Sequence, residues 1–330
     1  MLYSIPALYC PFPVAIHPRV NEIEEHTNQW VSNFDLLDNY DTFVHFRDSQ
    51  FGHFIARSFP EADFMKVSAW SDLNALLFIV DDQIDAQDII KDKDSFFGLM
   101  DKFIYVLQHR TKCTLKTDGN VLAALSDFWQ RITLLTEERW QKKFIKSIKD
   151  MFEGGYWQFE HLLLGKKPRF EEYLKVRQYF GAAHLSTDAL EGISGIDLPQ
   201  YVYEDPEVHR LTEIARNTIC FSNDLFSFGK ETQEVNNGAI FNLVMIVKDK
   251  YDLTVEQAIQ KTADIHDQLI REFLSLSKRV YKFGQAVDQV LKTYVDALGI
   301  LQRGNIEWST RETSRYPHVY QFPELNKVQN

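Results

Sequence analysis

The chain has 330 residues and a formal net charge of −11, from 36 basic and 47 acidic side chains. This acidic balance argues against a general nucleic-acid-binding surface, although an anionic ligand could still bind at a local positive site. Hydrophobic residues make up 45% of the chain, 25 of them Phe, and Gly and Pro number only 14 and 10. These counts favour a large helical core over a turn-rich β architecture.

The beginning of the chain and its cysteines indicate neither secretion nor disulfides. Residues 1–20 are apolar, but prolines interrupt them and no basic segment precedes them, so we expect an extended N-terminal arm and not a signal peptide. Cys10, Cys113 and Cys220 are scattered and include no CxxC pair. No run approaches the roughly 20 apolar residues that span a bilayer. We therefore expect a cytoplasmic protein without membrane contact.

Helical periodicity dominates the chain after this arm, and breaks in it set the expected helix ends. The expected helices cover residues 21–34, 51–57, 67–83, 95–109, 119–135, 137–165, 170–190 with an interruption at Gly181, 207–230, 242–250, 254–277 and 281–303. Residues 111–118 are expected to form a loop and residues 317–330 an irregular tail. Because no strand hairpin, repeat or low-complexity linker is evident, the sequence predicts one all-α domain over residues 1–330.

The first chemical motif follows an apolar run at the end of the expected helix 67–83. Its aspartates are Asp81, Asp82 and Asp85. Residues four apart on a helix differ by about 40°, so Asp81 and Asp85 share a face, whereas Asp82 points about 100° away. Two carboxylates on one face repel each other unless a cation such as a hard divalent metal ion lies between them. A solvated acidic surface would give the same pattern, so both interpretations stay open here.

The second motif is a polar stripe late in the chain. Asn223, Ser227 and Glu231 lie at positions i, i+4 and i+8, so on a helix they form one line with a rise of about 6 Å between neighbours. Their amide, hydroxyl and carboxylate oxygens suit a magnesium ion, although a chance polar stripe would look alike. If both motifs face each other across a helical bundle, they would hold several divalent cations that neutralise a polyphosphate.

With these motifs in this order, the chain resembles the microbial class I terpene synthases, which cyclise linear isoprenyl diphosphates. The resemblance extends to Arg177, which lies 46 residues before Asn223, and to Trp308-Ser309 and Arg315-Tyr316 near the C-terminus. It implies a class I terpenoid-synthase-like bundle of ten or more helices around a central cavity. It also implies three Mg²⁺ ions, two held by Asp81 with Asp85 and the third by Asn223, Ser227 and Glu231.

The resemblance also implies roles for side chains around the diphosphate. Those expected to donate hydrogen bonds to it are Arg177, Lys230, Arg315 and Tyr316. Asp82 fits better as a hydrogen-bond acceptor behind the ligands, pairing with an arginine. Gly181 and Phe180 match the family's effector and linker positions, which couple diphosphate sensing to ionisation. The family often has Asp at the linker position, so Phe180 departs from its pattern, and Gly181 could instead simply allow close helix packing.

Aromatic side chains have a separate expected role. Loss of diphosphate leaves a carbocation, which needs a dry cavity lined with aromatic faces. Phe78 lies one turn before Asp81, and Trp308 resembles the family's C-terminal cavity aromatic, so both are expected in this wall. Phe54, Phe180 and Phe221 are weaker candidates, since core packing is the commoner fate of a phenylalanine.

We expect a magnesium-dependent cyclase of farnesyl diphosphate, with geranylgeranyl diphosphate as the other candidate substrate. The alternatives are a chain-elongating isoprenyl diphosphate synthase, which would carry a second aspartate-rich motif in place of residues 223–231, and a non-catalytic helical interaction protein. The N-terminal arm and the loop 236–238 are expected to close over the site. The family analogy also allows a homodimer.

Overall fold

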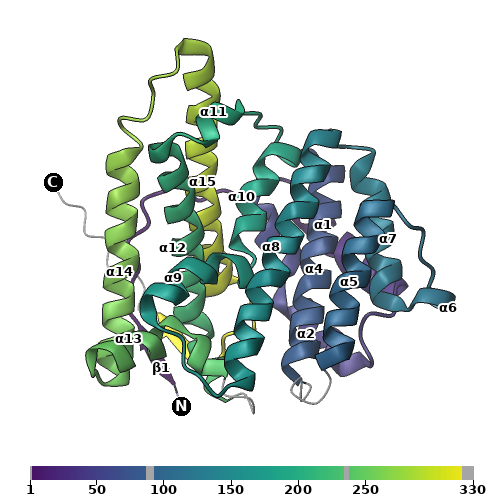
Figure 1. Ribbon diagram of the computed structural model, residues 1–330, viewed down its shortest axis with the longest axis horizontal. Helices are drawn as coiled ribbons and strands as arrows, with labels where there is room; N and C mark the ends of the chain where they lie inside the picture. Colours follow the sequence, from purple (N-terminus) through teal and green to yellow (C-terminus); the bar gives the residue numbers. More distant parts are fainter. Residues whose placement is uncertain (1, 87–92, 234–237, 322–330) are drawn as a thin grey trace.

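Helices account for most of the backbone in the computed structural model, which describes residues 2–86, 93–233 and 238–321 (Figure 1). The all-α prediction is therefore confirmed. In chain order the elements are β1 (Tyr3–Ile5), α1 (Val20–Asn33), α2 (Tyr40–Ser49), α3 (Phe51–Ser58), α4 (Phe64–Ala86), α5 (Lys93–His109), α6 (Leu115–Asp118), α7 (Asn120–Thr133), α8 (Glu138–Leu163), α9 (Phe170–Phe180), α10 (Ala183–Gly192), α11 (Gln200–Tyr203), α12 (Pro206–Glu231), η2 (Gly238–Phe241), α13 (Leu243–Tyr251), α14 (Val255–Leu276), α15 (Gln285–Arg311) and β2 (Val319–Gln321).

Helix α4 is apolar on every side, which is typical of a helix in the interior of a bundle. It packs against α1, α3 and α7. Its buried residues begin at Val67 and include Trp70, Leu76 and Ile79. The middle of α4 is therefore covered by other helices, whereas Asp81 at its C-terminal end is exposed.

Helix α12 is the second long interior helix, and its start follows from local chemistry. Asp205 accepts hydrogen bonds from the backbone N–H groups of Glu207 and Val208, and Pro206 occupies the first helical turn. The helix packs against α14 and α15 and contacts α9 and α13. Lys230 Nζ lies 3.1 Å from Asp82 Oδ1, so the C-terminal ends of α12 and α4 meet at one end of the bundle.

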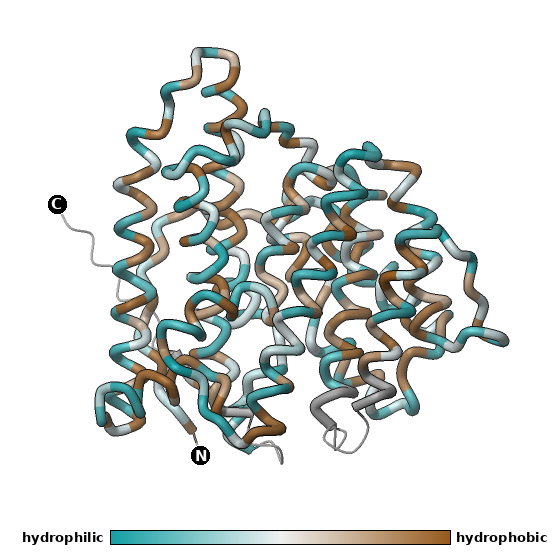
Figure 2. The backbone as a smooth tube through the Cα atoms, in the orientation of Figure 1, coloured by the Kyte–Doolittle hydropathy of each residue, from teal (hydrophilic) through white to brown (hydrophobic). Residues whose placement is uncertain are grey.

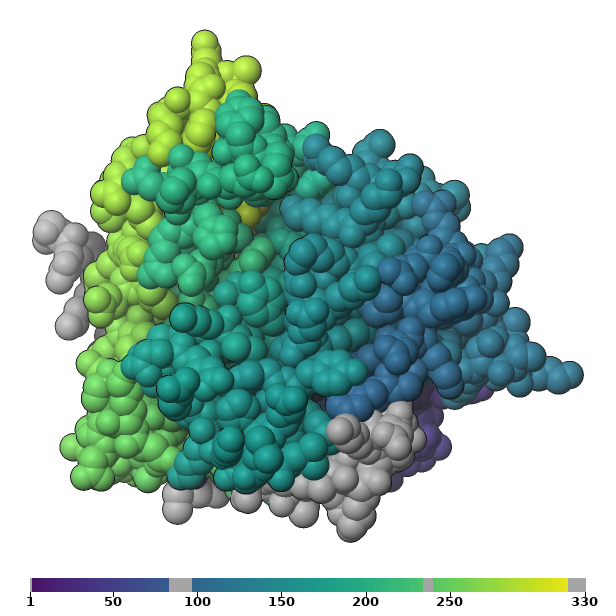
Figure 3. Space-filling model, in the orientation of Figure 1, coloured from purple at the N-terminus to yellow at the C-terminus, as the bar shows by residue number. Residues whose placement is uncertain are grey.

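The outer helix α14 is amphipathic, whereas the interior helix α4 is not. Along α14, at one side of the molecule, polar and apolar residues alternate with the helical period, as Figure 2 shows. A capping box between Thr254 and Gln257 fixes the start of this helix. The face in Figure 3 consists mostly of the middle of the chain, with the N-terminal residues almost hidden. None of the helices in the described segments is long and apolar enough to cross a membrane.

The two ends of the chain meet in a small parallel sheet. β1 pairs with β2 in the register Tyr3↔Val319, and Tyr3 N donates to His318 O at 2.9 Å. The arm is extended up to α1, as predicted, but the tail from residue 317 is not irregular throughout, because residues 319–321 form β2. Because β1 and β2 lie far apart in the sequence, no local sequence pattern predicts their pairing.

Several helix limits differ from the predicted ones. Helices α2, α6 and α11 were not predicted, and α6 lies inside the expected loop 111–118. Helix α15 begins at Gln285 and not at residue 281, because Gly284 adopts a left-handed φ of 93° that ends the preceding segment. It continues to Arg311, beyond the expected end at residue 303, since no Gly-Pro signal stops it.

Candidate active site

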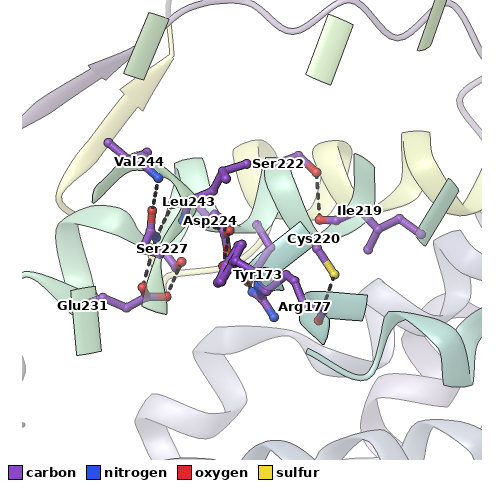
Figure 4. A network of polar contacts seen from close by, with 12 residues as sticks. Tyr173, Arg177, Ile219, Cys220, Ser222, Asp224, Ser227, Glu231, Leu243 and Val244 are labelled. Carbon is purple, nitrogen blue, oxygen red and sulfur yellow. Dashed lines mark hydrogen bonds and ion pairs between the residues drawn. The ribbon is translucent and has the colours of Figure 1, made fainter. Parts of the chain in front are cut away.

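The stripe predicted on residues 223–231 lies on the last turns of α12 (Figure 4). Ser227 Oγ donates to Glu231 Oε1 at 2.5 Å, so these two side chains converge. Asn223 Nδ2 donates to the Tyr316 hydroxyl at 2.9 Å, and its Oδ1 accepts from Arg177 at 3.1 Å. The structure therefore brings the stripe together with two of the residues expected at the diphosphate.

The Glu231 carboxyl titrates at an unusually high pH for its type. Burial is the main reason that its pKa rises to about 7, and the negative charge of Asp224 adds to this effect. Hydrogen bonds from Ser227 and Asn242 act in the opposite direction because they stabilise the charged form. A cation beside Glu231 would likewise favour the carboxylate.

At the end of α4 the aspartates lie in different surroundings. The Asp81 side chain is accessible to solvent, yet it lies among enough protein that lost solvation, together with the Asp82 charge, raises its pKa. Asp82 accepts two hydrogen bonds from Arg315, at 2.7 and 2.8 Å, and one from Lys230 at 3.1 Å. The expected pairing of Asp82 with an arginine is thus confirmed. The side chain of Asp85 lies outside the described residues.

This pairing decides the charge of Asp82. Burial alone would raise its pKa, but the hydrogen bonds and positive charge of Arg315, and then those of Lys230, lower it to about 2. Asp82 is therefore a carboxylate throughout the physiological range. The two cations near it, Arg315 and Lys230, were both predicted to bind diphosphate, and in this arrangement they share the single negative charge of Asp82.

Arg177 reaches the site from α9 and is buried, with 7% of its surface exposed. Its Nε and Nη2 donate to Asp224 Oδ1 at 2.9 and 2.7 Å, and Tyr173 donates its hydroxyl to Asp224 Oδ2 at 2.6 Å (Figure 4). Burial alone would lower the pKa of Arg177, but the charge of Asp224 raises it. The guanidinium is thus a buried cation whose charge is balanced by the residue next to Asn223.

The helix is interrupted after α9, at Gly181, as the sequence predicted. The left-handed residue in this break is Ala182, with φ 55°, whereas Gly181 has an ordinary φ of −84°. Gly181 is required for space instead: a Cβ there would lie 1.8 Å from Arg177 Nη1 and 3.0 Å from the Arg177 carbonyl oxygen. Its missing side chain leaves room for the Arg177 guanidinium.

Replacing Gly181 with alanine should therefore displace the Arg177 guanidinium from Asp224. We expect a stability loss of about 1–3 kcal/mol from overpacking and a fall in turnover of roughly tenfold or more. Urea denaturation and a steady-state assay would measure the two effects. Gly98→Ala is the matched control, because no atom lies within 4 Å of the added Cβ and alanine favours the helix. Equal behaviour of both variants would contradict the spatial role of Gly181.

An aromatic cluster lies against the Arg315–Asp82 pair. Phe78 stacks on Phe51 with ring centroids 4.4 Å apart, and Trp308 lies 4.8 Å from Phe54 and 6.2 Å from Phe78. The Arg315 guanidinium sits 5.1 Å from the Phe78 ring centroid. Trp308 is fixed in place, since its indole N–H donates to the carbonyl oxygens of residues 49 and 50. Phe78, Trp308 and Phe54 therefore lie together, next to the Arg315–Asp82 pair.

The other two weaker aromatic candidates lie elsewhere. Phe180 stacks on Trp157 at 5.9 Å and lies 4.8 Å from the Arg177 guanidinium. Its ring thus lies against the Arg177 guanidinium, although it cannot accept a hydrogen bond as an Asp carboxylate would. Phe221 is 1% exposed and belongs to the hydrophobic core, as does Trp308, which is buried to the same degree.

The donor set on α12 fits a hard cation. Amide, hydroxyl and carboxylate oxygens are the ligand types that Mg²⁺ takes, and Ser227 and Glu231 already touch. Among the side chains that the structure describes, which do not include Asp85, no group of three or more His, Cys, Asp or Glu gathers as a metal site would. This result agrees with a stripe that uses only one carboxylate among three ligands.

Three residues that complete this network were not singled out from the sequence. Asp224 and Tyr173 pair with Arg177, and Asn242 donates to Glu231 Oε2 at 3.0 Å. The available signal for Asp224 was its position one residue, or about 100°, away from the stripe on a mostly apolar helix. Of the loop 236–238, residues 236 and 237 lie outside the described residues.

Comparisons with known proteins support the family resemblance independently of the site geometry. A family model described as terpene synthase family 2, C-terminal metal binding, matches residues 72–272. The (+)-T-muurolol synthase ((2E,6E)-farnesyl diphosphate cyclizing) of Roseiflexus castenholzii is 29% identical over 319 residues, or 96% of this chain and 95% of that protein. The (+)-eremophilene synthase of Sorangium cellulosum is 26% identical over 306 residues, or 93% and 91%. The crystal structure of germacradien-4-ol synthase from Streptomyces citricolor, 20% identical, covers 92% of this chain and 97% of its own with a TM-score of 0.77, which shows the fold.

Proposed function

The chain belongs to terpene synthase family 2, and from this premise we propose that it cyclises farnesyl diphosphate with the help of Mg²⁺. The single observation that carries the proposal is the convergence of the α12 stripe, Arg177 and Tyr316 through direct hydrogen bonds. The name of one relative, the (+)-T-muurolol synthase ((2E,6E)-farnesyl diphosphate cyclizing), favours the C15 substrate over geranylgeranyl diphosphate. The product would be a cyclic terpene hydrocarbon or alcohol, with diphosphate released.

In this proposal the oxygen ligands divide between two helices. Asp81 and Asp85 of α4 would hold two ions, and Asn223, Ser227 and Glu231 of α12 a third. Bound cations would stabilise the negative charge that develops on the leaving diphosphate. The protein's part is to hold these ligands on rigid interior helices, so that their oxygens point to one place before the substrate arrives.

Four donors would bind the diphosphate oxygens: Arg177, Lys230, Arg315 and Tyr316. Each is close to the stripe or to Asp82. Arg315 Nε is buried and has no hydrogen-bond partner in the part of the chain that the structure describes, so it offers a donor in addition to those on Asp82. The cations are now paired with carboxylates, and diphosphate would compete with Asp82 for Arg315 and Lys230.

The chemistry would then proceed within the substrate. The allylic carbon–oxygen bond breaks with its electron pair leaving on diphosphate, a double bond of the same chain attacks the cation, and loss of a proton or addition of water ends the reaction. Phe78, which is only partly buried, would face this cation, because aromatic rings stabilise positive charge without adding a nucleophile, and the buried Trp308 would support Phe78 from behind. Gly181 would act through Arg177, for which it leaves space.

Incubation of the purified protein with farnesyl or geranylgeranyl diphosphate and Mg²⁺ tests this function. Gas chromatography with mass spectrometry should find a cyclic C15 product, and chelation of the metal should abolish it. A longer isoprenyl diphosphate would support the chain-elongating alternative. Absence of turnover with any isoprenyl diphosphate would overturn both, and gel filtration of the same sample would test for a homodimer.

A further inference from the structure

Asn242 lies between η2 and α13 and is fully buried, with 0% of its surface exposed. Its Oδ1 accepts a hydrogen bond of 2.9 Å from Val244 N and so caps α13. A cap of this kind requires only an acceptor oxygen, which Ser, Thr or Asp would also supply. The cap alone does not explain the presence of an amide at this buried position.

The other end of the Asn242 amide contacts a different helix. Its Nδ2 donates to the backbone oxygen of Asp224 at 2.7 Å and to Glu231 Oε2 at 3.0 Å. These acceptors lie seven residues apart on α12, which is about two helical turns. One side chain at the start of α13 therefore spans the last two turns of the helix that carries the stripe.

An amide is suited to both tasks at once. It offers one acceptor oxygen for the cap and two N–H donors for the two acceptors on α12. Aspartate would keep the cap, but it would place a second negative charge against the Glu231 carboxylate. Serine would keep the cap as well, but its shorter side chain ends before the acceptors on α12.

The direction of these donors is set by the backbone. Leu243, the next residue, donates its N–H to Asp224 Oδ2 at 3.1 Å, so two successive residues fix the start of α13 to α12 (Figure 4). Neither contact involves an exposed side chain, because Asp224 is 1% and Leu243 0% exposed. The position of Asn242 relative to Glu231 is thus held rigidly.

Glu231 is the last residue of α12, so no further helical turn restrains its side chain. Among the described residues, its carboxylate receives one hydrogen bond on each oxygen, from Ser227 on Oε1 and from Asn242 on Oε2. We propose that Asn242 is a positioning residue for Glu231, which it holds in line with Ser227 and Asn223 for metal binding. The inference rests on the proposed function, because it assumes that Glu231 is a metal ligand.

Asn242→Ser tests the proposal, since it keeps the cap, removes both donors and adds no charge. Binding of Mn²⁺ to the full chain, with inorganic diphosphate present, can be followed by electron paramagnetic resonance. We expect the dissociation constant for Mn²⁺ to rise by about 10–100-fold, as is usual when a residue behind a metal ligand is lost. In the turnover assay, the Mg²⁺ concentration for half-maximal rate should rise by a similar factor, with a smaller effect on kcat at saturating Mg²⁺.

Thr254→Ala is the matched control, because it removes the cap of the neighbouring helix α14 without touching the site. It should lower the melting temperature but leave the affinity for Mn²⁺ unchanged. If Asn242→Ser does not fold, Asn242→Asp, which preserves size and cap, must weaken Mn²⁺ binding in its place.

Glu231→Gln separates failure of the inference from failure of the function. If Glu231→Gln weakens Mn²⁺ binding and the folded Asn242 variant binds like wild type, the positioning role is wrong while the metal site stands. If Glu231→Gln itself leaves Mn²⁺ binding unchanged, the metal role of Glu231 fails, and the role of Asn242 falls with it.

Discussion

Replacing Arg177 with methionine should lower the free energy of unfolding by about 3–5 kcal/mol, because it leaves the buried carboxylate of Asp224 without its balancing charge. Tyr173 and Leu243 N would still donate to Asp224, but neither carries a positive charge. The same variant should reduce turnover on the order of 10²–10³-fold, as expected for the loss of a donor to the leaving group. Urea denaturation followed by circular dichroism, and gas-chromatographic product analysis, measure the two effects.

The control for this prediction is Arg210→Met. Arg210 pairs with Glu272 at the surface, where the two side chains are 37% and 39% exposed, so its loss should cost less than about 1 kcal/mol. The double variant Arg177→Met/Asp224→Leu should regain part of the lost stability, since a buried pair can be replaced by apolar residues. It should not regain turnover. If Arg177→Met is as stable as Arg210→Met, the pair with Asp224 does not hold α9 on α12.

The helices were predictable where the chain marks their ends locally. The break after α9 was located because Gly181 interrupts a regular pattern, and the periodicity of residues 254–277 gave both ends of α14 to within one residue. Helix α2 was missed although Asn39 and Thr42 form a capping box, since the pattern after them is short and weakly apolar. The pairing of β1 with β2 depends on the folded positions of both ends of the chain, which no local signal carries.

The site was predictable to the extent that it follows helical spacing. Spacing placed Asn223, Ser227 and Glu231 on one line, and the contact of Ser227 with Glu231 agrees with it. Spacing also separated Asp82 from Asp81, and Asp82 does pair with Arg315. Helical spacing could not predict which side chain on another helix each charged residue would pair with.

The positively charged side chains of the site have carboxylate partners in the structure. From the sequence, Arg177, Arg315 and Lys230 were donors awaiting a diphosphate; in the structure Asp224 and Asp82 already bind them. Arg177 is buried with its partner Asp224. The Asp82 carboxylate is 40% exposed, so Arg315 and Lys230 can exchange it for another anion at less cost. We therefore expect Arg315 and Lys230 to rearrange when diphosphate binds and Arg177 to move less.

Replacing Asn223 with alanine should separate catalysis from stability in a way that Arg177 cannot. Asn223 is only partly buried and makes two hydrogen bonds, to Tyr316 and from Arg177, so its loss should cost about 1 kcal/mol. If its Oδ1 is a metal ligand, turnover should fall by at least about 10²-fold, more than the loss of a residue behind the ligands would cause. Asp81→Ala on α4 should have a comparable effect on turnover.

Gln233→Ala provides the comparison for Asn223→Ala, because Gln233 donates a hydrogen bond to the Gly229 carbonyl just beyond the same helix end but lies outside the stripe. Its turnover should stay near that of wild type. Circular dichroism should find the same helix content in all three variants, and titration calorimetry with Mg²⁺ and inorganic diphosphate should find weaker binding for Asn223→Ala and Asp81→Ala alone. If Asn223→Ala retains near-normal turnover and Mg²⁺ affinity, the stripe on α12 is not a metal site, and its contacts with Arg177 and Tyr316 serve only to join α9 and the C-terminal segment to α12.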